Sequence, residues 1–370
     1  MRLDAAVGAL TQRRCRGDSV SDDETADVRP DEVMDWDTVA AYLRGRVDGA
    51  EGPMRVRQFP GGSANLTYLI TFDAPDGPHE FVLRRPPLGP VAPGAHDMAR
   101  EHKVLSRLYA PYPRAPRSYH LCTDESVVGA KFIVVERRTG VVIRDRFPDA
   151  MLEHPRLAER ATYALVDAMA ELHNVEPAAH GLADLGKPDG FAQRQVDGWA
   201  ARWELAKDKD VPLVYEIHRR LNASVPKPSR VSILHNDLKF DNCQYQTHDP
   251  DRVTSIFDWD MATLGDPLFD LGTLLGYWSE TTDPAPRGQR PTGAGDPFPT
   301  RAQITRRYAE TTGIDMRHVN WYEAFALWKT TVVVQQIYIR FARGQTKDAR
   351  FARIAERQPI LLEAAARLDF

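Results

Sequence analysis

Residues 232–258 read SILHNDLKFDNCQYQTHDPDRVTSIFD and contain the spacing HxDxxxxN between an apolar run and two short strand-like segments. In phosphoryl-transfer enzymes an aspartate of such a loop accepts the proton of the attacking hydroxyl, and an asparagine later in the loop binds a divalent metal. Asp237 and Asn242 stand at those positions. A turn capped by Asp and Asn side chains would give the same letters, so the motif alone favours neither interpretation.

The segments on either side of the turn THDPDR favour the metal-binding interpretation over a simple capped turn. Residues 243–246 and 253–257 are predicted to pair as an antiparallel hairpin, which returns Asn242 and Asp258 to the same end. Mg²⁺ takes hard oxygen donors from few side chains and leaves its other positions to water and substrate phosphates. The sequence therefore predicts that Asn242 and Asp258 are metal ligands, with Asp260 as a third candidate.

A nucleotide site is expected upstream, in residues 54–85. Runs at 54–59, 66–72 and 81–85 predict a three-stranded antiparallel meander. The loop PGGSAN joins the first two strands, and glycines there let backbone N–H groups approach phosphate oxygens. An ordinary hairpin turn is the alternative. We predict that the following loop residues contact the nucleotide: Gly61, Gly62, Ser63 and Asn65.

Arg84 and Glu101 are expected to form an ion pair in the same part of the chain. Glu101 lies on the apolar stripe of a predicted helix over 95–109, where an unpaired carboxylate would be costly. In kinases a strand lysine holds the phosphates and pairs with a helix glutamate; Arg84 is the cation available for that role here, and arginine is not interchangeable with lysine. After the next strand, residues 134–137 predict the connection between two lobes, where Val135 and Glu136 would meet a nucleotide base.

The remaining composition describes a two-lobed protein. The 370 residues exceed one ordinary core, and helical patterns dominate after about residue 140. We expect a disordered or extended tail over 1–34, a first lobe over 35–137 and a second over 138–370. A formal charge of −4 and pI near 6.3 argue against nucleic acid as a partner. Three distant cysteines, no secretion signal and no long apolar run predict a cytoplasmic protein without a membrane partner.

The segments HNDLKFDN and IFDWDMATLGDPLFDLG together resemble the catalytic and metal-binding segments of the aminoglycoside phosphotransferase-like small-molecule kinases. The segments FPGGSANLTYLITF, FVLRRPP and REHKVL resemble the branch found beside acyl-CoA dehydrogenase domains. The resemblance implies an α+β, bilobal protein-kinase-like fold: an antiparallel sheet plus helix, then a mostly helical lobe with a catalytic hairpin. It also implies Asp237 as catalytic base, Asn242 and Asp258 as metal ligands, and His235 and Asp270 as supports of the catalytic loop.

The resemblance implies transfer of the γ-phosphate of ATP, or GTP, to a hydroxyl of a small molecule with Mg²⁺, and hydroxyacyl thioesters as acceptors. An aminoglycoside would call for an acidic wall, whereas the acceptor region mixes Arg with Asp and Glu. Because of Arg84, a nucleotide-binding protein with weak or no turnover is an alternative of another class. Candidate acceptor contacts, for several of which core packing competes, are Trp199, Arg202, Trp203, Trp321, Gln335, Tyr338 and Arg340. The oligomeric state is left open.

Overall fold

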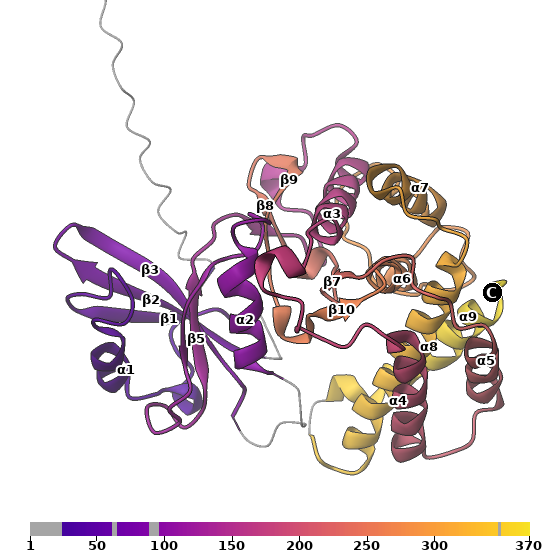
Figure 1. Cartoon of the computed structure of the whole chain (residues 1–370), viewed down its shortest axis with the longest axis horizontal. Helices are drawn as coiled ribbons and strands as arrows, with labels where there is room; N and C mark the ends of the chain where they lie inside the picture. Colours follow the sequence, from indigo (N-terminus) through magenta and orange to yellow (C-terminus); the bar gives the residue numbers. More distant parts are fainter. Residues whose placement is uncertain (1–23, 61–64, 89–95, 347–348) are drawn as a thin grey trace, which may run out of the picture.

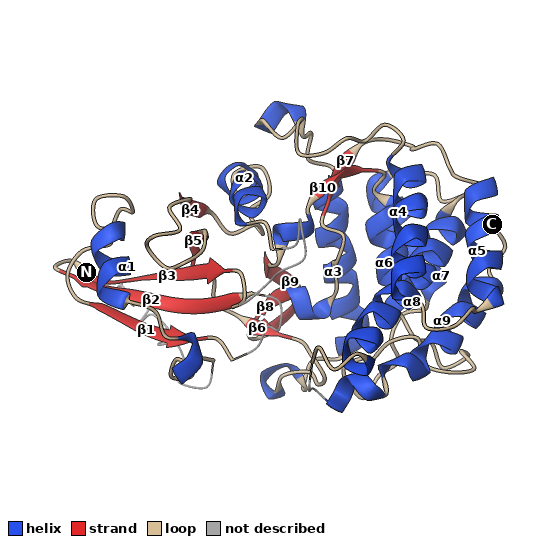
Figure 2. Ribbon diagram, turned by 90° about the horizontal axis from the view of Figure 1, so that it is seen from below, coloured by secondary structure: helices blue, strands red, loops and turns tan. Residues whose placement is uncertain are grey.

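The computed structural model describes residues 24–60, 65–88, 96–346 and 349–370. A lobe built on one antiparallel sheet lies beside a larger helical lobe (Figures 1 and 2). The short strands β6, β8 and β9 lie where the two lobes meet. This is the bilobal α+β architecture expected from the sequence.

The sheet of the first lobe has five strands in the order β1-β2-β3-β5-β4. Alternate residues serve its two faces, as the period of a strand requires. Leu83 and Val134 pack with Val39 and Leu43 of the first helix, whereas Val82 faces the second lobe. The strands are β1 (Met54–Gln58), β2 (Leu66–Ala74), β3 (Gly77–Arg85), β4 (Ser118–Cys122) and β5 (Phe132–Glu136). The helices are α1 (Trp36–Leu43) and α2 (Met98–Leu108).

Residues 24–34, which the sequence analysis assigned to a tail, lie against this sheet. Ala26 and Gln58 exchange two backbone hydrogen bonds of 2.8 Å, and a short 3-10 helix follows at Pro30–Glu32. β1 is an edge strand, so its outward backbone groups need a partner, and this segment supplies one. Residues 24–34 thus pack on the sheet of the first lobe as an extended segment with one short 3-10 turn, ahead of the expected lobe boundary at residue 35.

The second lobe packs its helices around α6 and α8, and α8 is the long apolar helix near the end of the chain. Gly272 of α6 comes so close to α8 that a Cβ there would lie 2.5 Å from the backbone of Tyr322. In the described part of the chain, no helix is long and apolar enough to cross a membrane. The helices are α3 (Leu157–His173), α4 (Phe191–Ala206), α5 (Pro212–Ala223), α6 (Leu268–Tyr277), α7 (Arg301–Thr312), α8 (Val319–Ala342) and α9 (Arg357–Ala366).

Five short strands carry the functional loops of the second lobe. β8 and β9 form the expected hairpin, and β7 pairs with β10 beneath the loop that follows residue 234. These strands are β6 (Val141–Val142), β7 (Ser232–Leu234), β8 (Cys243–Gln246), β9 (Asp249–Ile256) and β10 (Thr263–Gly265).

Candidate active site

The loop over 235–242 is held from behind by Asp270, in the first turn of α6. The Asp270 carboxylate accepts the backbone N–H of His235 at 2.7 Å and that of Asn236 at 2.6 Å. It also contacts Nε2 of His173 at 3.1 Å. Asn236 has φ = 69°, a left-handed conformation that asparagine tolerates better than most residues. Burial raises the pKa of Asp270, but its hydrogen bond and charge interaction with His173 outweigh this, so the pKa lies below its usual range.

His235 ties this loop to the end of the hairpin. The backbone N–H of Asp237 donates to Nδ1 of His235 at 3.3 Å, so Nδ1 is an acceptor and Nε2 carries the proton. Nε2 donates to the carbonyl of Phe257 at 2.7 Å. Both nitrogens are therefore engaged by the protein, and the ring is fully buried. The geometry gives His235 a positioning role and leaves no nitrogen for a reacting group.

The Asp237 carboxylate is the polar centre of the loop. It accepts hydrogen bonds from Nζ of Lys239, at 3.0 and 2.8 Å, and from Nδ2 of Asn242 at 3.0 Å. About a quarter of the Asp237 side chain, 26%, stays exposed. Burial lowers the pKa of Lys239, but the Asp237 charge outweighs it and raises that pKa above its ordinary value. A carboxylate held this way can meet a hydroxyl from solvent or from a bound molecule.

Asn242 and Asp258 lie together, at the open end of the hairpin. The N–H of Phe257 donates to the carbonyl of Asn242 at 2.9 Å, and both side chains line one cavity of about 500 Å³. Their oxygens are the donors that Mg²⁺ prefers. Among the described residues no group of three or more His, Cys, Asp or Glu could hold a metal ion. A magnesium ion would thus rely on these two side chains, water and phosphate oxygens, which is the donor set expected for it.

Arg84 joins the two lobes at this cavity. Its Nη2 donates to Oδ1 of Asp258 at 2.9 Å, and its Nε lies 3.1 Å from Oε1 of Glu101. Burial raises the pKa of Glu101 to about 7, although Arg84 opposes the shift. Burial likewise raises the pKa of Asp258, but Arg84 outweighs it and the net shift is downward. The Arg84–Glu101 pair was expected, whereas the link to Asp258 was not.

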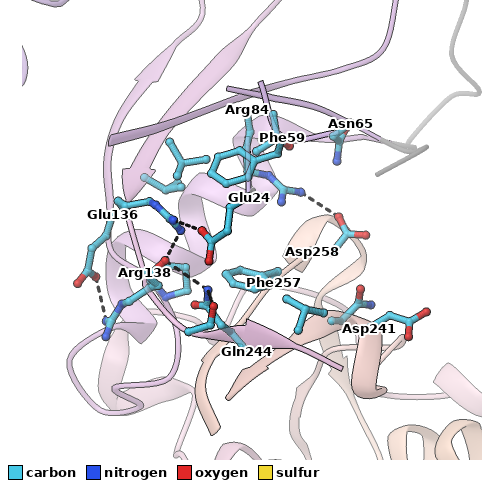
Figure 3. Close-up of a pocket in the computed structure, with 18 of the residues that line it drawn as sticks. Glu24, Phe59, Asn65, Arg84, Glu136, Arg138, Asp241, Gln244, Phe257 and Asp258 are labelled. Carbon is cyan, nitrogen blue, oxygen red and sulfur yellow. Dashed lines mark hydrogen bonds and ion pairs between the residues drawn. The ribbon is translucent and has the colours of Figure 1, made fainter. Parts of the chain in front are cut away.

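The cavity is apolar on its walls and polar at its ends (Figure 3). Val82 and Val135 belong to its wall, and Asn65 lines it from the start of β2. Gly61, Gly62 and Ser63 lie outside the described residues. The Glu136 side chain also borders the cavity, but its carboxylate pairs with Arg138 at 2.9 Å and accepts the N–H of Arg117. The lining residues that the sequence analysis did not name include Glu24, Phe59 and Phe257.

Four of the seven candidate acceptor residues are buried. Buried side chains that pack or bond internally are Trp199, Trp203, Trp321 and Gln335. Tyr338 is half-buried and Arg340 is exposed. Arg202 is exposed and stands 4.3 Å above the Trp199 ring.

Lys329 of α8, which sequence reasoning missed, also approaches the Trp199 ring, at 5.6 Å. Burial lowers its pKa, and Asp237 is the carboxylate that counters this most strongly. Lys329 is therefore close enough to Asp237 for their charges to interact. Its position in a long apolar helix gave no signal in the sequence.

A catalytic loop and a hairpin below an antiparallel sheet, with a cavity between two lobes, define a kinase-like phosphotransferase fold. Residues 55–307 match the family model described as "Phosphotransferase enzyme family". Because this match spans more than half of the chain, the protein belongs to that phosphotransferase family, abbreviated APH.

Two curated relatives and one solved structure place the chain more closely. Mouse acyl-CoA dehydrogenase family member 10 is 28% identical over 331 residues, and human family member 11 is 27% identical over 343. These alignments cover 88% and 89% of this chain but only 30% and 42% of the relatives, so the chain spans less than half of their length. A candidate aminoglycoside phosphotransferase of Ralstonia eutropha has a TM-score of 0.76 and 27% identity, covering 91% of this chain and all of the other.

Proposed function

We propose that this protein transfers the γ-phosphoryl group of ATP or GTP to a hydroxyl of a small molecule, with Mg²⁺. The observation that carries the proposal is the meeting of Asn242 and Asp258 at one cavity, directly beside the Asp237 carboxylate. The arrangement provides oxygen donors for a cation next to a proton acceptor, which are the two requirements of phosphoryl transfer.

The side chains divide the work as follows. Asp237 accepts the proton of the acceptor hydroxyl, and the hydrogen bond from Asn242 keeps its carboxylate in place. Lys239 forms an ion pair with the Asp237 carboxylate and places a positive charge where the transferred phosphoryl group develops negative charge. Asn242 and Asp258 would hold Mg²⁺, which supplies charge neutralisation to the phosphates. Arg84, already between Glu101 and Asp258, offers a fork of donors that suits phosphate oxygens.

For the acceptor we propose an anionic molecule with a free hydroxyl, such as a hydroxyacyl thioester. Lys329 and Arg202 contact Trp199, and neither has an ion-pair partner among the described residues. An acceptor with several ammonium groups would be repelled by these cations. The curated relatives are named as acyl-CoA dehydrogenases, which favours acyl thioesters over the alternative, an aminoglycoside or another antibiotic.

The experiment is a nucleotide-consumption assay with purified protein, MgATP or MgGTP, and four acceptor classes: hydroxyacyl thioesters, free hydroxy acids, aminoglycosides and macrolides. Asp237→Ala should keep nucleotide binding and slow transfer by about 10²-fold or more. Asp258→Ala should abolish metal-dependent turnover. The matched control is Asp251→Asn, an exposed carboxylate paired with Arg160 outside the cavity. Wild-type turnover in either active-site variant would refute the assigned role.

A nucleotide-binding protein with weak turnover is the second candidate, because Arg84 already occupies one oxygen of Asp258. The two candidates differ in one measurement. Thermal stabilisation by nucleotide and Mg²⁺, with no consumption on any acceptor class, would favour the second.

A further inference from the structure

The N-terminal segment brings a carboxylate into the cavity between the lobes. Residues 24–27 run beside β1, where Arg57 donates to the carbonyl of Thr25 at 2.9 Å and to Asp27 at 2.7 Å. Thr25 is 7% exposed, so the segment is packed and not merely laid on the surface. Glu24 is the first residue of this segment, and it lines the cavity. In Figure 3 its carboxylate lies between the rings of Phe59 and Phe257.

Arg137 fixes this carboxylate at the connection between the lobes. Arg137 directly follows β5, and its guanidinium pairs with Oε2 of Glu24 and lies 5.2 Å from the Phe59 ring centre. The Arg137 side chain is 8% exposed, whereas that of Glu24 is 34% exposed. In the described part of the chain, Oε2 of the Glu24 carboxylate pairs with Arg137, and its other oxygen accepts no hydrogen bond. Its other oxygen is therefore available to a molecule in the cavity.

The part of the cavity beside Glu24 has the chemistry to bind a purine base. Phe59, Val82, Val135 and Phe257 offer apolar surface for a flat ring, and an ionised carboxylate can only accept hydrogen bonds. Its partner on the ligand must then be a donor. Adenine and guanine each carry an exocyclic amino group, whereas hypoxanthine carries none.

We propose that Glu24, held by Arg137, accepts a hydrogen bond from the exocyclic amino group of the nucleotide's purine base. This inference rests on the proposed function, since it names a contact of the same nucleotide site. Glu24 lies outside residues 55–307, so the family match does not include it.

The test compares the binding of ATP, GTP and ITP, each with Mg²⁺ and without acceptor, by titration calorimetry on the full chain. ITP lacks the exocyclic amine and serves as the reference. We expect the wild type to bind ATP or GTP about tenfold more tightly than ITP, which corresponds to one hydrogen bond to a charged group. Glu24→Ala should abolish this preference while changing ITP binding by less than about twofold. Glu24→Gln keeps an acceptor oxygen and should retain part of it.

The control is Asp27→Asn, in the same segment, whose side chain is 94% exposed and pairs with Arg57. It should keep the preference intact. If Glu24→Ala weakens all three nucleotides equally, Glu24 only anchors the segment and the inference is overturned, while the proposed function stands. An unchanged preference overturns it in the same way. If the wild type binds none of the three, the proposed function fails as well.

Discussion

Replacing Asp270 by asparagine tests how the catalytic loop is held in shape. The carboxylate accepts two backbone N–H groups, at 2.7 and 2.6 Å, and also contacts His173. Asparagine has one acceptor oxygen, so its amide nitrogen must face a donor. A hydrogen bond to a charged group contributes roughly 1.5–3 kcal/mol, and the N–H that loses its acceptor belongs either to His235, which is buried, or to Asn236, which is half-buried. We expect Asp270→Asn to lower the free energy of unfolding by about 3 kcal/mol.

Differential scanning calorimetry should record this loss as a fall in Tm of about 3–5 °C. Turnover should drop by about 10–100-fold, because Asp237 loses its fixed position relative to the phosphate. Asp251→Asn removes an exposed carboxylate of the same kind and should melt within 1 °C or so of the wild type. A similarly small shift for Asp270→Asn would refute the reasoning, since the buried contacts would then contribute nothing.

Three further changes probe packing, the interlobe ion pair and pH. Gly272→Ala should destabilise the protein by about 1–3 kcal/mol in urea unfolding, because its Cβ would clash with the Tyr322 backbone; Gly276→Ala, whose Cβ would meet its nearest neighbour at 3.2 Å, should cost less. Arg84→Ala should cost about 3–5 kcal/mol by calorimetry, since Glu101 stays buried without its cation, and Arg84→Lys should fall between it and the wild type. Between pH 4.5 and about 7 the folded protein keeps the Glu101 proton that the unfolded chain releases, so stability should fall as pH rises; Glu101→Gln should flatten that slope in chemical unfolding.

The sequence predicted the fold because its local and long-range signals agree. The alternation of Leu66, Tyr68, Ile70 and Phe72 predicted a strand of the sheet. Two short strand-like segments around a polar turn predicted the hairpin. The carboxylate of Glu101 on an apolar helical face required a cation, and Arg84 is that cation in the structure. The pairing of residue 26 with residue 58 was not predicted, because backbone hydrogen bonds leave no mark on the side-chain pattern.

Contacts of the candidate site that follow from local strand pairing could be predicted from the sequence. Contacts that depend on how the two lobes are placed were missed. Asn242 and Asp258 meet because antiparallel strands return to one end, which a sequence discloses. The link from Arg84 to Asp258 depends on the distance between the lobes, which no sequence period encodes. The same holds for Glu24 and Arg137, which are 113 positions apart. The spacing of Trp199 in the sequence is consistent with core packing and with ligand binding. The burial of its side chain in the structure favours packing.

The close approach of α6 to α8 at Gly272 reaches beyond packing. Asp270 is two positions before this glycine on the same helix, so the acceptors that hold the catalytic loop share a rigid frame with the backbone of α8. We expect a displacement of α8 at this turn to move α6, and with it the Asp270 carboxylate that accepts the N–H groups of His235 and Asn236. Remodelling of the proposed acceptor wall for a new specificity should therefore leave the turn of α8 around Tyr322 untouched and concentrate on Lys329, two turns further along the same face of that helix.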